Sequence, residues 1–186
     1  MFRKNAKNFS LLVVIQFVFI ILVAQPGVPS TKWTAEGSSY YTLESSTKNK
    51  DKKQIVKIDL PSQDKSVFIA YKQLLLPGGD TLNPRSFQLS SDGKLALIYT
   101  NAQKVWRYPT RGDYWLLNLA SGQLKQIGKG RPAASLQFAK FSRDNKKVAY
   151  VSERNIYAED LATGTIKKLT SDNGTKKLIN GTFDWV

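Results

Sequence analysis

A weak internal repeat constrains the fold of this chain more than any other feature. The clearest copy occupies residues 138–170 and divides into four short segments of mostly β-favouring residues, separated by turns. Two further copies begin at Phe87 and at Trp33. Each copy has an aromatic residue, a turn, an apolar strand, and a segment that ends in Asp or Asn followed by Leu. A unit of about 40 residues with four antiparallel strands is typical of a β-propeller blade.

The corners of these copies carry residues that tolerate a positive φ. The first corner is Asp92-Gly93 in one copy and Asp144-Asn145 in another. The next corner is Ser121-Gly122 or Thr163-Gly164. Gly and Asn adopt the left-handed conformation at the lowest cost, so these pairs predict tight turns between antiparallel strands.

The segments between the turns predict an all-β fold. Residues 95–99 and 147–151 are rich in apolar and β-favouring types, and we expect both strands to be buried on both faces. A β-sandwich is the alternative, because its strands also recur every 8–12 residues. A sandwich does not explain the repeat, so we expect a partial β-propeller of about three to four four-stranded blades. Because a propeller usually has four to eight blades, we further expect this sequence to be the front of a longer protein.

Two insertions fall at the same place in their copies, after the second strand. One covers residues 101–112. The other lies in a polar stretch, residues 45–54, that contains Lys48, Lys50, Lys52 and Lys53 and is expected to be an exposed loop. Binding residues are often carried by loops that a rigid scaffold positions, so the first insertion is a candidate site.

The N-terminus has the pattern of a secretory signal. Arg3, Lys4 and Lys7 precede a largely apolar run, residues 9–24, and a turn-rich stretch follows it. We therefore expect residues 1–24 to be a signal peptide, with an uncleaved membrane anchor as the alternative, and residues 25–186 to be propeller. Both readings place the propeller outside the cytoplasm, whether periplasmic, secreted or membrane-anchored.

Composition limits the chemistry that this chain can perform. It contains no His and no Cys, so it cannot form a Ser-His-Asp or Cys-His triad, and a structural zinc site is not expected. We expect no cofactor. The 28 Lys and Arg residues outnumber the 14 Asp and Glu residues, which raises the question of nucleic acid. No nucleic-acid motif accompanies the charge, so a solvated basic surface is favoured.

Two segments resemble the dipeptidyl peptidase IV branch of the prolyl oligopeptidase family. One is LTSDNGTKKLINGTFDWV, residues 169–186, and the other is KVWRYPTRGDYWLLNL, residues 104–119, with its Trp-Arg pair. The resemblance implies an eight-bladed propeller over an α/β-hydrolase domain that holds a Ser-Asp-His triad. It also implies release of X-Pro or X-Ala dipeptides from peptide N-termini, with two propeller glutamates binding the substrate ammonium.

Carried onto this chain, the resemblance assigns substrate binding to Arg107, which would contact the carbonyl oxygen of the first substrate residue. The glutamates would begin past Val186, and the triad would lie in a hydrolase domain absent from this chain, so the chain alone should be inactive. Arg111 and Asp113 are expected to position the loop through a local ion pair. Asp184 and Trp185 are expected to support the segment that leads to the glutamates.

The partners implied are peptides with Pro or Ala at the second position, the protein's own hydrolase domain and, as an open alternative, a second copy. Nucleic acid is not among them. The rival hypothesis is a non-catalytic extracytoplasmic propeller that binds a protein or a polyanion.

Overall fold

The computed structural model describes residues 30–105 and 108–182, which form three four-stranded antiparallel sheets and one short 3-10 helix. The first sheet contains β1 (Lys32–Trp33), β2 (Ser39–Ser45), β3 (Lys53–Asp59) and β4 (Lys65–Ile69). The second contains β5 (Ser86–Leu89), β6 (Leu95–Val105), β7 (Tyr108–Asn118) and β8 (Leu124–Ile127). The third contains β9 (Gln137–Phe141), β10 (Lys147–Ser152), β11 (Asn155–Asp160) and β12 (Ile166–Lys168). The helix, Tyr71–Leu74, follows β4.

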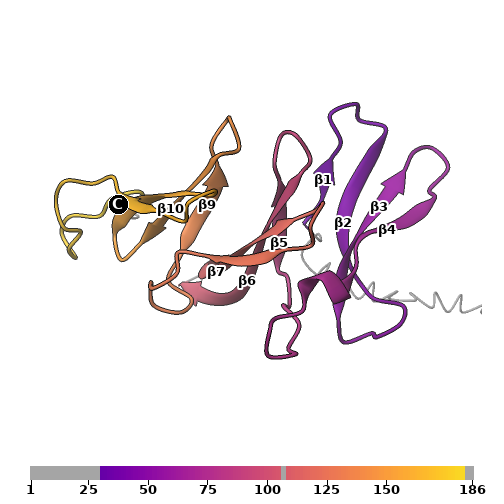
Figure 1. The fold of residues 1–186 in the computed structure, drawn as a ribbon, viewed down its shortest axis with the longest axis horizontal. Helices are drawn as coiled ribbons and strands as arrows, with labels where there is room; N and C mark the ends of the chain where they lie inside the picture. The colour runs from indigo at the N-terminus through magenta and orange to yellow at the C-terminus, as the bar shows by residue number, and fades with distance from the viewer. Residues whose placement is uncertain (1–29, 106–107, 183–186) are drawn as a thin grey trace, which may run out of the picture.

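Each sheet is a meander in which neighbours in sequence pair in space, and the three sheets follow one another along the longest axis of the molecule (Figure 1). The all-β prediction and the three repeated units are thereby confirmed. Three stacked sheets also reject the two-sheet sandwich. Within the described residues the sheets form an open row that does not close on itself.

The turn predictions are confirmed as well. Gly93 and Asn145 have φ values of 68° and 57°, and Gly122 and Gly164 have values of 72° and 73°. These residues occupy equivalent corners of the second and third sheets. The agreement follows from the local nature of the constraint, since a turn of this kind requires a residue that tolerates the left-handed region.

A serine and an aspartate hold the first turn of each of these two sheets. The Ser90 hydroxyl donates to Asp92 Oδ1 at 2.6 Å and accepts from the Leu95 N–H at 2.9 Å. Ser142 donates to Asp144 Oδ1 at the same 2.6 Å. These side chains take up backbone and hydroxyl donors that the turn would otherwise leave to water.

The Ser–Asp turns predict a loss of stability in acid. The hydrogen bond from Ser90 is the largest cause that lowers the pKa of Asp92 below its ordinary 3.8, and Ser142 does the same for the pKa of Asp144. A lowered folded-state pKa stabilises the fold above the ordinary value, and this contribution is lost as pH falls below about 3.8. NMR titration should show it, and Ser90→Ala should raise the pKa of Asp92. An unchanged value would contradict the assignment.

Two apolar cores lie between the sheets. The core between the first and second sheets contains Leu43, Ile55, Ile69, Leu74, Leu82, Phe87, Ala96, Ile98 and Leu117. The core between the second and third sheets contains Leu97, Tyr99, Tyr114, Leu116, Ile127, Leu136, Ala139, Val148, Tyr150 and Tyr157. Strand β7 alternates between them, with Tyr114 facing the third sheet and Trp115 packed against the first core. The second sheet is therefore buried on both faces.

We predicted burial on both faces for residues 95–99 and 147–151; this is confirmed for residues 96–99, whereas Leu95 is half-buried, and it is wrong for residues 147–151. In β6, residues 96–99 are all buried, whereas Ala149 in β10 is exposed. The cause is position in the row, because the third sheet packs against the second on one face only. Its other face is covered in part, where Gly181 lies against Ile156.

The lysine-rich stretch is largely an exposed connection between β2 and β3, as predicted, but it is shorter than expected. Strand β2 continues to Ser45 and β3 begins at Lys53, whose Nζ donates to Pro84 O at 3.1 Å. Residues 1–24, Asp184 and Trp185 lie outside the described residues. In the part of the chain that is described, no helix has the length and apolar character to cross a membrane.

Candidate functional site

The candidate site is a two-stranded arm that projects from the second sheet. Strands β6 and β7 continue past their neighbours, and pairing extends from Thr100↔Asp113 to Val105↔Tyr108. We call residues 100–105 and 108–113 the arm. The predicted insertion 101–112 is therefore a continuation of the β6–β7 hairpin instead of a separate loop. Arg107, the predicted substrate-binding residue, lies outside the described residues.

Two opposed bulges shape the arm. The register passes from Thr100↔Asp113 to Gln103↔Arg111, so two residues of β6, at 101 and 102, oppose the single residue Gly112. The register shifts back between Gln103↔Arg111 and Val105↔Tyr108, because two residues of β7, at 109 and 110, oppose the single residue at 104. Bulges bend a strand and increase its twist, so this pair redirects the arm relative to its sheet.

Tyr99 ties the base of the arm to the sheet below it. Its hydroxyl lies 2.8 Å from both Pro109 O and Arg111 O, so its single hydrogen can be donated to either carbonyl oxygen. The Tyr99 side chain is buried, and its ring centroid is 4.8 Å from that of Tyr114. Burial raises the pKa of the Tyr99 hydroxyl, which keeps it neutral and able to donate.

Asp113 ties the arm to the segment between β8 and β9, which leads into the third sheet. Its Oδ2 accepts from Asn101 Nδ2 at 2.7 Å, and its Oδ1 accepts from the Ala134 N–H at 2.7 Å. Next to it, Gly112 and Leu136 exchange two backbone hydrogen bonds of 3.0 Å. The predicted ion pair of Asp113 with Arg111 is wrong, since none forms among the described residues. Asp113 does position the arm, through hydrogen bonds to an amide side chain and a backbone N–H.

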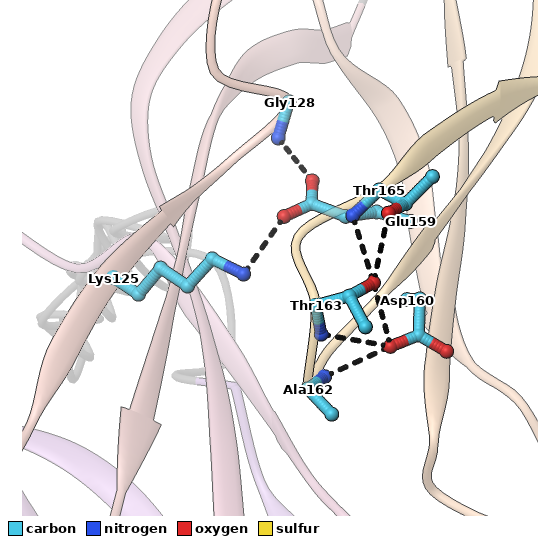
Figure 2. A network of polar contacts seen from close by, with 7 residues as sticks. All are labelled: Lys125, Gly128, Glu159, Asp160, Ala162, Thr163 and Thr165. Carbon is cyan, nitrogen blue, oxygen red and sulfur yellow. Dashed lines mark hydrogen bonds and ion pairs between the residues drawn. The ribbon is translucent and has the colours of Figure 1, made fainter.

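A buried carboxylate joins the second and third sheets below the arm. Glu159 in β11 is 1% exposed, and Figure 2 shows its carboxylate between Lys125 and Gly128. Glu159 Oε2 accepts from the Gly128 N–H at 2.7 Å, and Oε1 lies 3.2 Å from Lys125 Nζ. Sequence reasoning missed this residue. Alignment of the repeat places Glu159 where the second copy has Leu117, and that mismatch was the signal that could have found it.

A groove of about 930 Å³ opens beside the first strands of the three sheets. Its lining includes Trp33 from β1, Gln88 from β5 and Lys140 from β9, together with Asp92 and Tyr41. Trp33 is 61% exposed there. The groove is lined by aromatic, amide and charged groups of both signs. No group of three or more metal-binding side chains occurs within residues 30–105 and 108–182.

This chain is similar in sequence to known peptidases and to their family model. The family model for the dipeptidyl peptidase IV (DPP IV) N-terminal region matches residues 90–186. A probable dipeptidyl-aminopeptidase B of Aspergillus oryzae is 30% identical over 128 residues, covering 69% of this chain and 14% of that protein. The corresponding protein of Arthroderma gypseum is 29% identical over 125 residues, or 67% of this chain and 14% of its own.

A solved structure supports the fold. The crystal structure of Porphyromonas gingivalis dipeptidyl peptidase 4 superposes with a TM-score of 0.64 at 18% identity, covering 78% of this chain and 20% of that one. The chain thus spans about 14% of the length of the curated relatives it matches. The matched residues 90–186 include the whole arm and Glu159. On this match the chain belongs to the dipeptidyl peptidase IV N-terminal region family.

Proposed function

We propose that the natural protein is a dipeptidyl peptidase IV-like serine exopeptidase that releases X-Pro or X-Ala dipeptides from peptide N-termini. The membership of this chain in the family and the names of its relatives support the proposal. This chain has no His, so the proposal assigns the triad to a hydrolase domain outside this sequence. The propeller region would be inactive by itself and would lie outside the cytoplasm behind the signal or anchor at residues 1–24.

The observation that carries the proposal is the arm, which is held at its base by Tyr99 of its own sheet and by the connection between β8 and β9. The pair Val105↔Tyr108 directly flanks positions 106 and 107, where the sequence has Trp106 and Arg107. A guanidinium presents several donors in one plane, which suits a peptide carbonyl oxygen. An arginine presented by an arm of this kind can hold the first residue of a peptide, and such positioning lowers the entropic barrier of the reaction.

The groove supports a second part of the proposal, that this region gates access to the reaction. Its lining includes residues from the first strand of each sheet, among them Trp33 and Lys140. These groups suit the backbone amides and mixed side chains of an extended peptide. The proposed partners are peptides with Pro or Ala at the second position and the protein's own hydrolase domain, with a homodimer as an open alternative.

The test is Arg107→Ala in the natural protein, expressed from its whole gene and assayed with Gly-Pro-anilide. Loss of a charged hydrogen bond to the substrate should lower kcat/KM by roughly 20-fold. Lys104→Ala is the matched control, because it removes an exposed positive charge from the same arm and should leave kcat/KM within about twofold of the original.

The absence of turnover by the unaltered natural protein would reject the peptidase and favour a propeller that binds a protein or polyanion. The formal net charge of +14 is the observation behind the polyanion alternative. Binding of that kind weakens steeply as salt increases, so a salt series with heparin distinguishes the two hypotheses.

A further inference from the structure

The hydroxyl at the base of the arm has no counterpart in the other two sheets. Register places Tyr99 opposite Tyr114, and the equivalent pairs are Leu43↔Ile55 and Val151↔Ile156. The first and third sheets therefore have an aliphatic side chain at the position of Tyr99, and they also lack an arm, since their second and third strands are joined by residues 46–52 and 153–154. At this register position a tyrosine occurs only in the second sheet, which is also the sheet that carries the arm.

From this we infer that Tyr99 and Gly112 are positioning residues, which fix the direction of the arm. We call Tyr99, Gly112, Asp113 and Leu136 the arm joint. A two-stranded hairpin is marginally stable by itself, so the arm depends on contacts at its base. The inference that substrate placement depends on the joint rests on the proposed function, whereas the fixing of the arm does not.

The arm joint has no room for a side chain at position 112, so glycine is required there. A Cβ added there would lie 2.4 Å from Tyr99 Cε2 and 2.6 Å from Thr100 O. Any side chain would displace the Tyr99 ring or the β6 backbone. The absent side chain lets Tyr99 pass close to β7 and lets its hydroxyl reach the carbonyl groups of Pro109 and Arg111.

The Tyr99 hydroxyl lies where the pairing of β6 with β7 in the arm is irregular. Its acceptors belong to residues on either side of Thr110, in the part of β7 that carries the second bulge. Bulges interrupt the regular pairing of a ladder, and here the buried Tyr99 hydroxyl offers a donor to the carbonyl groups of Pro109 and Arg111. The hydroxyl therefore stabilises the bent form of the arm over a straight continuation of β6 and β7.

The test compares Tyr99→Phe with Tyr150→Phe in the natural protein. Both changes remove one buried tyrosine hydroxyl from the same interface, but the Tyr150 hydroxyl has no hydrogen-bond partner. Hydrogen exchange of peptides from residues 103–105 and 108–111 reports on the arm directly. Tyr99→Phe should speed their exchange roughly fivefold, and Tyr150→Phe should not change it.

Kinetics with Gly-Pro-anilide give the second readout. Tyr99→Phe should raise KM roughly fivefold with kcat within about twofold, because the hydroxyl places a binding group and takes no part in the chemistry. Gly112→Ala should act in the same direction and more strongly. If Gly112→Ala fails to fold, Tyr99→Phe still tests the inference, because it removes only one oxygen atom and introduces no new group.

The outcomes separate the two proposals. Unchanged exchange of the arm in Tyr99→Phe would overturn the joint, whatever the kinetics show. Faster exchange with an unchanged KM would overturn its role in substrate placement. Faster exchange in a natural protein that cleaves no Gly-Pro-anilide would reject the proposed function and support the joint.

Discussion

Replacement of Glu159 by alanine is expected to lower the free energy of unfolding by about 3 kcal/mol. The carboxylate is 1% exposed and accepts the Gly128 N–H at 2.7 Å. Alanine would leave this donor without its acceptor between the second and third sheets. Lys125 adds less to the loss, because its side chain is 36% exposed and its charge can turn to water.

Two further variants separate the contributions of the hydrogen bond, the charge and the apolar packing at position 159. Glu159→Gln keeps an oxygen for the Gly128 N–H and removes the charge, so it should cost about half as much as alanine. Glu159→Leu introduces the residue found at the equivalent position, Leu117, and restores apolar packing. It still leaves the Gly128 N–H unpaired, and its cost should fall between the other two.

Chemical denaturation of the natural protein measures these differences, and hydrogen exchange around Gly128 localises them. Glu153→Ala is the control from the same sheet. Its carboxylate lies 3.6 Å from Arg131 Nη1 with a side chain 55% exposed, so its removal should cost less than about 1 kcal/mol. Equal losses for Glu159→Ala and Glu153→Ala would show that the buried carboxylate has no special role.

Alkaline solution should weaken the same interface by several kcal/mol as pH rises from about 10 to about 12. Burial raises the pKa of Tyr114 from 10.0 to about 12, and burial together with the Glu159 charge raises the pKa of Tyr150 to about 12. Over this range the unfolded chain loses these two protons before the folded chain does. Unfolding is therefore increasingly favoured as pH rises through the interval.

Stability measured against pH, with tyrosinate absorbance as a second probe, tests this expectation. Tyr150→Phe should reduce the slope of stability between pH 10 and 12, because one of the buried tyrosines with a raised pKa is removed. Tyr108→Phe is the control, since Tyr108 is 66% exposed and should leave the slope unchanged. Ionisation of Tyr114 and Tyr150 near pH 10 in the folded protein would contradict the prediction.

The sequence predicted the position of the arm but not its structure. The repeat located the extra residues after the second strand of the second copy, because an insertion interrupts a periodic pattern visibly. It did not show that these residues continue the β ladder, since bulges such as the one opposite Gly112 hide the alternation. It also paired Asp113 with its neighbour Arg111, whereas the acceptor atoms serve Asn101 and Ala134.

The sequence alone determined that this chain builds repeated four-stranded sheets with turns at 92–93, 121–122, 144–145 and 163–164. Turn chemistry and strand alternation act over a few residues, so they can be read without knowing the fold. Only the tertiary structure decided which faces are buried and where Tyr99 and Glu159 find their partners. Those outcomes depend on one sheet lying against the next, as when Glu159 meets a backbone N–H 31 residues earlier in the chain.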